Sequence, residues 1–355
     1  MSVLKKKNIR FAVAGAILLF AALLLQVCAR ELRGFATWYA HGVYPILVGM
    51  IGRIMNVFPF SVVEIMLYLL IVGGVVYAVR FVRDPLRLLS RTVFLCGILF
   101  FLYTVNCGIN YSAMAFSEYV GLEPGQYTAE ELTELCELLV EQVNETATAE
   151  RYQGQEQAWR EEGVRAMQAA AGPLGGYYPK PKPVLVSWIL SVQQLCGVYS
   201  PFTIEANYNR VMPNYNIPHT ICHELSHLKG FMREDEANFI GYLACTSSDN
   251  QAFRYSGYLT GWVYAGNALA RTDREAYAEL YGKLCAQAQA DLAENNAFWN
   301  RYEGPVAEVS NQMNDTYLKM NRQTDGVRSY GRMVDLMLAY RRGNERIPAD
   351  QPGKE

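Results

Sequence analysis

The sequence predicts an α-helical membrane anchor of three transmembrane helices in residues 1–115, followed by a mainly helical α+β domain in residues 118–355. Three observations predict this arrangement. The first part holds three apolar runs of membrane-spanning length. The second part is more polar and combines helical periodicity with turn-rich connectors. It also contains the motif H-E-x-x-H at residues 223–227, which is typical of a metal site on a helix.

The composition excludes some classes of protein. The formal net charge is -2 and charged residues make up 19% of the chain, so no broad basic surface for nucleic acid is expected. The eight cysteines include no C-x-x-C pair. A cysteine-based zinc site or a thioredoxin-like redox motif is therefore not expected.

The three apolar runs predict transmembrane helices near residues 9–29, 61–82 and 92–112. The first run follows a cluster of three lysines, a flank that secretory signal peptides share. The apolar core of a signal peptide spans about 7–15 residues, and this run is longer. The two later runs also favour a retained anchor over a cleaved peptide.

A fourth apolar segment, residues 35–58, is interrupted by His41 and Arg53 and contains Trp38 and Tyr39. Tyrosine and tryptophan are common where a bilayer meets water. We expect an interfacial or partly re-entrant segment here and not a fourth span. This choice matters because a fourth span would reverse the side on which the rest of the chain lies.

Charge predicts the orientation of the anchor. Basic residues lie near the N-terminus (Lys5, Lys6, Lys7 and Arg10) and around the loop after the second run (Arg80, Arg83, Arg87 and Arg91). Acidic residues follow the third run (Glu118, Glu123, Glu130 and Glu131). The positive-inside rule places the N-terminus and that loop in the cytoplasm. Three spans then place residues 118–355 outside a cytoplasmic membrane.

The second part opens with Thr128-Ala129-Glu130-Glu131, a capping box that predicts a helix through about Val143. The other expected elements are a helix at 149–171, a turn-rich connector at 172–183, a short strand or helix start at 184–190, a strand at 202–209, and helices at 252–270, 273–298 and 330–342. The strand at 202–209 directly precedes the metal motif. It is either a core strand or a strand whose edge pairs with an extended peptide.

The motif places His223 and His227 on one face of a helix, one turn apart, where two imidazoles can bind one zinc ion. A catalytic zinc usually takes three protein ligands, and the only other histidines are His41 and His219. His219 and His227 are eight residues apart, which is about 12 Å along a helix axis. We therefore interpret His219 as a supporting residue beside the ligands.

The third ligand is then expected to be a carboxylate. Gly230 can end the first helix, and a second helix would bring Glu234 back to the metal. Asn238 lies four residues later on the same face, where its amide oxygen can accept a hydrogen bond from a ligand histidine. Glu236 is the alternative ligand, but it lies about 200° around the helix from Glu234, so both cannot bind one ion.

This pattern resembles the gluzincin class of zinc metallopeptidases, in which H-E-x-x-H is followed by E-x-x-x-D. Residues 234–241 resemble the E-x-x-A-D block of membrane-bound M48-type peptidases, with Asn238 in place of the usual Asp. Metzincins share H-E-x-x-H-x-x-G, but Arg233 stands where their third histidine would be. The resemblance implies a zincin-like metallopeptidase domain that binds one Zn²⁺ per chain.

More closely, the chain resembles DUF3810, a family of bacterial membrane proteins, which implies a bacterial cytoplasmic membrane as its location. The likeness lies in the three N-terminal spans and in several short blocks of the second part: Ser200-Pro201-Phe202-Thr203, Glu205-Ala206-Asn207, the motif at 223–227, residues 234–238, Asn314-Asp315, Tyr317-Leu318-Lys319 and Ser329-Tyr330.

These residues predict hydrolysis of peptide bonds. Zinc lowers the pKa of a bound water towards about 7, and Glu224 is expected to act as the general base. Tyr330, Arg332 and Tyr317 are candidates for stabilising the oxyanion. The expected partners are a peptide or protein substrate and the lipid bilayer. The alternative is a non-catalytic sensor or scaffold with a zinc-stabilised domain, which would have no need for Glu224.

Overall fold

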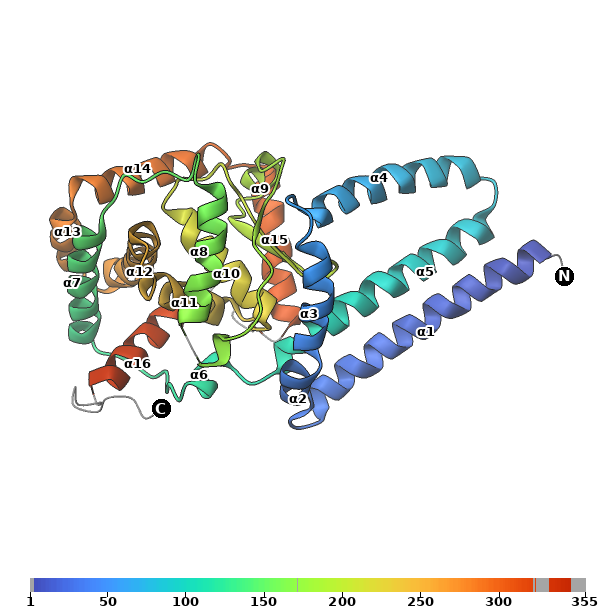
Figure 1. Ribbon diagram of the computed structural model, residues 1–355, viewed down its shortest axis with the longest axis horizontal. Helices are drawn as coiled ribbons and strands as arrows, with labels where there is room; N and C mark the ends of the chain where they lie inside the picture. The colour runs from blue at the N-terminus through green and yellow to red at the C-terminus, as the bar shows by residue number, and fades with distance from the viewer. Residues whose placement is uncertain (1–2, 171, 322, 324–331, 346–355) are drawn as a thin grey trace.

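The computed structural model describes residues 3–170, 172–321, 323 and 332–345. Three long helices project from one side of a helical body that contains a small sheet (Figure 1). They are α1 (Val3–Glu31), α4 (Val62–Phe81) and α5 (Pro85–Tyr103). Within the described residues, the stretches long and apolar enough to cross a membrane are Lys7–Glu31, Val62–Phe81 and Pro85–Ser112. The prediction of three apolar membrane-length helices is confirmed.

The third helix begins earlier than the predicted 92–112. The side chain of Asp84 accepts a hydrogen bond from the backbone N–H of Arg87, and Pro85 occupies the first turn. Both features start a helix. After Tyr103 the chain continues through a π-helical turn, η1 (Thr104–Gly108), and a short 3₁₀ turn, η2 (Asn110–Ser112), into the body.

The N-terminus and the α4–α5 connection lie together at the end far from the body (Figure 1). Helices α1 and α5 pack closely through two glycines. A Cβ on Gly15 would lie 2.6 Å from the Val93 carbonyl oxygen, and a Cβ on Gly97 would lie 2.6 Å from the Gly15 carbonyl oxygen. Small residues allow such close approach between membrane helices.

Residues 35–58 form α2 (Phe35–Gly42) and α3 (Tyr44–Met55), and neither is among the membrane-length helices of the described chain. Both lie against the body (Figure 1). The hydroxyl of Tyr44, which is fully buried, donates to the Leu228 carbonyl oxygen at 3.0 Å and lies 2.9 Å from the hydroxyl of Tyr199. Part of the predicted membrane part therefore belongs to the core of the body.

The body helices are α6 (Phe116–Tyr119), α7 (Ala129–Thr146), α8 (Glu156–Ala169), α9 (Trp188–Val192), α10 (Asn216–Lys229), α11 (Glu234–Thr246), α12 (Gln251–Thr272), α13 (Arg274–Lys283), α14 (Ala286–Asn300), α15 (Pro305–Met320) and α16 (Met333–Glu345). Short 3₁₀ turn η3 (Gly172–Leu174) follows α8. The capping box at Thr128 is present. The expected helix at 273–298 is two helices, and α15 was not predicted.

The sheet has the order β1–β3–β2, with β1 (Lys182–Pro183) parallel and β2 (Gly197–Ser200) antiparallel to β3 (Glu205–Tyr208). The strand expected at 202–209 was wrong at its start, because the chain turns before Glu205 and Ile204 has a φ of 51°. As the central strand, β3 has both edges paired and cannot take an added peptide. The run at 184–190 leads from β1 into α9.

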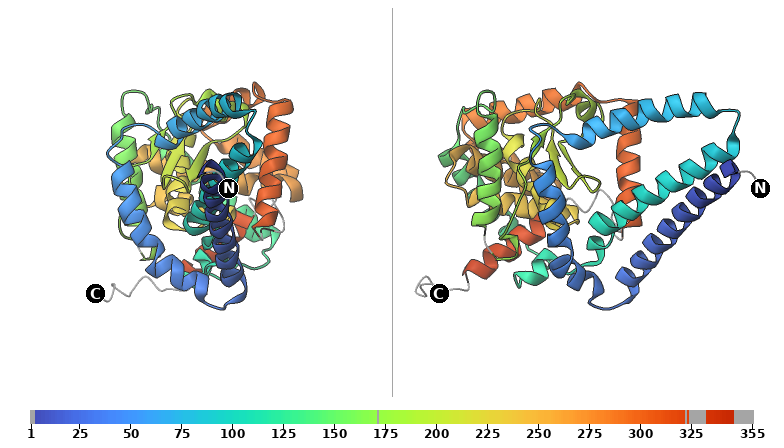
Figure 2. Two further views of the ribbon diagram at one scale, coloured as in Figure 1. Left: turned by 90° about the vertical axis from the view of Figure 1, so that its right-hand side faces the viewer. Right: turned by 45° about the vertical axis from the view of Figure 1, so that its right-hand side comes forward.

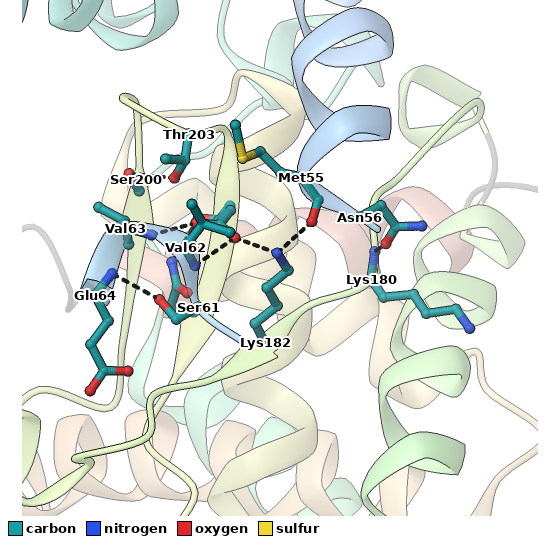
Figure 3. Close-up of polar contacts among 12 residues, drawn as sticks. Met55, Asn56, Ser61, Val62, Val63, Glu64, Lys180, Lys182, Ser200 and Thr203 are labelled. Carbon is teal, nitrogen blue, oxygen red and sulfur yellow. Dashed lines mark hydrogen bonds and ion pairs between the residues drawn. The ribbon is translucent and has the colours of Figure 1, made fainter. Parts of the chain in front are cut away.

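A buried joint links the sheet to the start of α4 (Figure 3). The Glu205 carboxylate accepts the backbone N–H groups of Val62 and Val63 at 3.1 and 2.9 Å and pairs with the Lys182 ammonium. Both charged side chains are 1% exposed. Lys182 also donates to the Met55 carbonyl oxygen at the end of α3, at 2.7 Å. A carboxylate suits the N-terminus of a helix because the free N–H groups and the helix dipole attract negative charge.

Candidate metal centre

The two motif histidines face one point in the structure. They lie on α10, whose i and i+4 positions share a face. The Nε2 atoms of His223 and His227 are 3.1 Å apart. Helix α10 ends at Gly230, which has a left-handed φ of 111°. This conformation favours glycine and reverses the chain toward α11.

Helix α11 brings the predicted carboxylate to the histidines. The Glu234 oxygens lie 3.3 Å from the Nε2 of His223 and 3.6 Å from the Nε2 of His227. One potential ligand atom from each of the three side chains lies within 4.8 Å of the other two. Arg233 precedes the helix in an extended conformation, so Glu234 lies in the first turn of α11.

Hydrogen bonds on the far side of each ring fix how the histidines point. The Nδ1 of His223 lies 2.9 Å from the Asn238 Oδ1, and the Nδ1 of His227 lies 2.9 Å from the Phe231 carbonyl oxygen. Both partners are acceptors, so each Nδ1 carries the proton and donates it. Each Nε2 then presents its lone pair to the shared point, which is the tautomer a metal ligand requires.

Glu236, the alternative ligand, faces away from this point. Its carboxyl group lies by the backbone of Phe116 and Ser117, and its nearest basic group is Arg233 at 3.9 Å. Burial raises the pKa of Glu236 to about 7. The charge of Arg233 and hydrogen bonds from that backbone lower this pKa, but they only partly offset the effect of burial. The geometry thus favours Glu234 as the residue that shares the histidines' site.

His219 supports the centre without facing it. Its Nε2 donates to the backbone carbonyl oxygen of Asn238 at 3.0 Å, and its backbone N–H donates to the Ser256 hydroxyl at 3.0 Å. Burial lowers the pKa of His219 to about 3, with a smaller effect from nearby His223. A neutral His219 therefore ties α10 to the turn of α11 that carries Asn238.

The Glu224 side chain is buried beside the histidines and under strand β2. Among the described residues, its Oε2 atom has no hydrogen-bond partner. Burial, and to a smaller extent the nearby Glu234, raise the pKa of Glu224 to about 8 against the opposing effects of His223 and the backbone of Tyr199. Strand β2 approaches so closely that a Cβ on Gly197 would lie 2.5 Å from the Glu224 Oε1.

The centre opens into a cavity of about 1040 Å³. Its walls come from α10 and α11, from β2 and the preceding loop, and from helices that the sequence did not connect with the site. These further residues include Tyr264 on α12, Asn295 and Trp299 on α14, and Ser310 and Asn314 on α15. Burial raises the pKa of the Tyr264 hydroxyl, so it stays a hydrogen-bond donor. Of these positions only Asn314 lies in a block that the sequence singles out, and all of them meet only through the fold.

Of the three candidates for oxyanion stabilisation, the structure places Tyr317 at the cavity of the centre. Tyr317 lines the cavity, and its hydroxyl accepts a hydrogen bond from Tyr111 at 3.2 Å. Arg332 pairs with Asp235 at 3.2 Å and lines a separate cavity of about 350 Å³. Tyr330 lies outside the described residues.

The donor set fits a zinc ion. Two neutral imidazoles and one carboxylate are the ligands of a catalytic zinc site with one position left for solvent. The buried carboxyl groups of Glu224 and Glu234 also repel each other, and a divalent cation between the donors would offset that repulsion. The geometry is therefore suited to a metal that binds nitrogen and oxygen.

The sequence profile described as "Protein of unknown function (DUF3810)" matches residues 39–338. The chain belongs to the DUF3810 family. No curated protein and no solved structure matches it. The DUF3810 match begins after α1 and includes every residue of the metal centre, from His219 to Asn238.

Proposed function

We propose that this DUF3810 protein is a membrane-anchored zinc metallopeptidase with a zincin-like, gluzincin-type site. The observation that carries the proposal is the convergence of His223, His227 and Glu234, with ligand atoms within 4.8 Å of one another. Both ring tautomers suit metal binding, because the Nδ1 atoms donate to oxygen acceptors. Glu224 lies beside this group with a buried oxygen that no described residue satisfies.

His223, His227 and Glu234 would hold the zinc. A zinc ion held there would lower the pKa of a bound water towards about 7 and polarise a carbonyl group. Asn238 keeps the His223 ring oriented, and the Phe231 carbonyl oxygen does the same for His227. These outer contacts maintain the basic Nε2 atoms in position.

Glu224 would move the proton. Without a metal, burial brings the pKa of its carboxyl group to about 8, with Glu234 acting in the same direction, and a cation held by the three ligands would lower this pKa toward neutral pH. A group with such a pKa can accept a proton from the nucleophile and return it to the leaving amine. The close packing of Gly197 restricts where this carboxyl group can lie.

Strand β2 would bind the substrate backbone. One edge of β2 pairs with β3. On that same side, just before β2, the Cys196 carbonyl oxygen accepts the backbone N–H of Asn209 at 2.7 Å. Backbone groups alternate in direction along an antiparallel strand, so those of Gly197 and Tyr199 point toward the other edge, where the Tyr199 backbone already contacts the Glu224 carboxyl group. Gly197, Val198 and Tyr199 line the cavity. An extended peptide can therefore pair with β2 near Gly197, which is one of the two roles that the sequence left open for residues 202–209.

We place the protein in a bacterial cytoplasmic membrane as a multi-pass protein, with the N-terminus inside and the peptidase domain outside. The basic ends of the membrane helices support this orientation. The N-terminus and the α4–α5 connection lie at one end, and the body lies at the other (Figure 1). Arg80 in the last turn of α4, Arg83 in the connection and Arg87 in the first turn of α5 lie at that first end. The three-span count also agrees with an extracytoplasmic body.

The test compares the full-length protein with a Glu224→Gln variant in detergent micelles. We expect about one zinc per chain in both proteins, and cleavage of a random peptide library by the unaltered protein alone. A His223→Ala variant should lose the zinc. Zinc binding with equal cleavage by the Glu224→Gln variant would refute the mechanism. Zinc binding without any cleavage by the unaltered protein would favour the sensor or scaffold.

A further inference from the structure

Helix α3 is apolar on two opposite faces. Tyr44, Val48 and Gly52 are buried against the body. Ile46, Met50 and Ile54 lie on the opposite face and are between 60% and 63% exposed. A soluble protein rarely leaves a continuous row of large apolar side chains in water. The outer face of α3 therefore needs a covering.

Helix α15 carries a second apolar stripe. Val306, Val309, Met313 and Met320 recur at helical spacing and are between 55% and 71% exposed, and Met313 also lines the rim of the cavity described above. Ala307 and Leu318, on another face, are buried against the body. The polar residues of the helix lie apart from the stripe; they include Glu308, Gln312, Asp315 and Lys319.

The two stripes belong to helices that lie beside the membrane-length helices. Seen along those helices from their far end, α3 and α15 lie on either side and run across their direction (Figure 2, left). The C-terminal end of α15 is bonded to the body end of α5, because the Tyr103 hydroxyl donates to the Asn321 Oδ1 at 3.0 Å. Tyr317 is also 3.5 Å from the Cys107 sulfur. Helix α3 is joined to α4 by only a short turn.

We propose that α3 and α15 lie in the bilayer interface, and that the substrate is the stretch of a membrane-anchored polypeptide that lies next to its own membrane span. The occupant of both stripes is lipid, because α3 is followed directly by α4 and α15 is hydrogen-bonded to the end of α5, and both α4 and α5 have the length and apolarity of membrane spans. An interfacial helix lies in the plane of the membrane with its apolar side in the lipid. The crossed arrangement in Figure 2 matches that geometry.

The position of α15 in the bilayer interface determines the height at which the cavity opens. Ser310, Asn314 and Tyr317 of α15 line the cavity, as do Cys107 and Tyr111 from the body end of the third membrane-length stretch. With α15 at the bilayer surface, the cavity lies at the height where an anchored polypeptide leaves the lipid. A freely dissolved peptide gains nothing from that placement. This part of the inference rests on the proposed peptidase function.

Two carboxylates hold the cavity at a fixed position relative to the membrane helices. Glu205 of β3 binds the first N–H groups of α4, as described above. Glu64, within the first turn of α4, accepts the backbone N–H groups of Leu185 and Val186 at 2.7 and 2.9 Å. Both joints are buried, so the sheet beside the cavity moves with α4 as one unit.

The interfacial position of α15 is tested by labelling cysteine variants of the full-length protein with a water-soluble maleimide. Val309→Cys lies in the stripe, and Gln312→Cys lies on the polar face of the same helix. Both are labelled in lipid nanodiscs and in mild denaturant, with peptide-level mass spectrometry to separate them from native cysteines. We expect the nanodisc to slow labelling at 309 about tenfold relative to 312. Equal labelling rates at 309 and 312 in nanodiscs would refute the interfacial position of α15.

The substrate class is tested by presenting one cleavable sequence in two ways. A sequence selected from the peptide library is used either as a soluble peptide or fused to a membrane helix in the same nanodisc. We expect the anchored form to be cleaved about 10²-fold or more efficiently, because anchoring raises its effective concentration at the cavity. Val309→Glu and Met320→Glu should reduce that advantage and leave the soluble rate unchanged. Gln312→Glu, the matched control, should change neither.

The outcomes separate the two proposals. Equal cleavage of both forms, or an unchanged advantage in Val309→Glu, would overturn the substrate class and leave the peptidase function standing. If the zinc-bound protein cleaved no sequence of the library, soluble or anchored, the peptidase function and the substrate class with it would be overturned. The maleimide result at residue 309 would still decide whether α15 lies in the interface.

Discussion

Replacing Asn238 by alanine isolates the contact that orients one metal ligand. The Asn238 Oδ1 lies 2.9 Å from the His223 Nδ1, and Asn238 is 4% exposed. In the Asn238→Ala variant, α11 no longer offers an acceptor to the Nδ1–H of His223, and little solvent reaches this N–H group. The backbone carbonyl of residue 238, which binds His219, is unchanged. The substitution therefore removes one hydrogen bond and leaves the ligands and the second histidine contact in place.

The expected loss follows from the burial of the donor. A buried donor without a partner costs about 1–3 kcal/mol, and each 1.4 kcal/mol is roughly a tenfold change in a binding constant. Zinc affinity should thus fall by about 5-fold to 150-fold, which overlaps the roughly 10–100-fold typical for residues that orient a ligand. Asn238→Asp restores an acceptor with a negative charge, and we expect it to bind zinc at least as tightly as the unaltered protein.

The assay is a competitive titration with a fluorescent zinc chelator on the full-length protein in detergent, with circular dichroism to confirm folding. Asn311→Ala is the matched control, because this exposed asparagine lines the cavity on α15 but contacts neither histidine. It should bind zinc normally. If Asn238→Ala bound zinc as tightly as this control, the reasoning about the His223 tautomer would be wrong.

Three further outcomes are expected. Gly197→Ala should lower kcat by about 10²-fold with zinc still bound, measured by peptide hydrolysis, because the new Cβ displaces the general base Glu224 by a large fraction of an ångström. Glu234→Gln should weaken zinc binding strongly while Glu236→Gln retains it; the reverse result in the chelator titration would make residue 236 the ligand. Lys182→Met should destabilise the protein by about 3–5 kcal/mol, because it leaves a buried carboxylate unpaired; an unchanged thermal unfolding midpoint would contradict this.

The convergence of the three side chains of the candidate metal centre was predictable because they are close in sequence. His223 and His227 are one helical turn apart, Gly230 supplies the reversal, and Glu234 opens the next helix. Helical geometry alone then places Asn238 on the same face as Glu234. The membrane-length helices were predictable for a similar reason, since a span is a property of one continuous stretch.

The strand assignment failed at a backbone feature that alternation does not reveal. Residues 202–209 alternate between apolar and polar side chains, but the chain turns through Ile204, which has a φ of 51°. A β-branched residue rarely adopts a positive φ, so nothing in its identity marks a turn. The true neighbour of Glu224 is β2, and its position depends on pairing with β3.

Helix α15 and Tyr264 were missed because their roles depend on distant contacts. Gly304 and Pro305 form a helix start that the sequence contains. The stripe that follows is interspersed with polar residues, so its periodicity is weak on its own. That α15 lines the cavity becomes visible only when the contact between Tyr317 and the end of α5 is known.

The contacts around Glu224, the proposed general base, connect it to α4 through the sheet, a route that the proposed zinc ligands do not share. The start of α4 is bonded to Glu205 on β3, β3 pairs with β2, and β2 packs Gly197 against the Glu224 carboxyl group. The ligands lie on α10 and α11 and take their orienting hydrogen bonds from α11 and the preceding loop. A change in how α4 sits in the bilayer therefore reaches the base through the sheet before it reaches the metal. The lipid environment should accordingly affect turnover more strongly than zinc affinity.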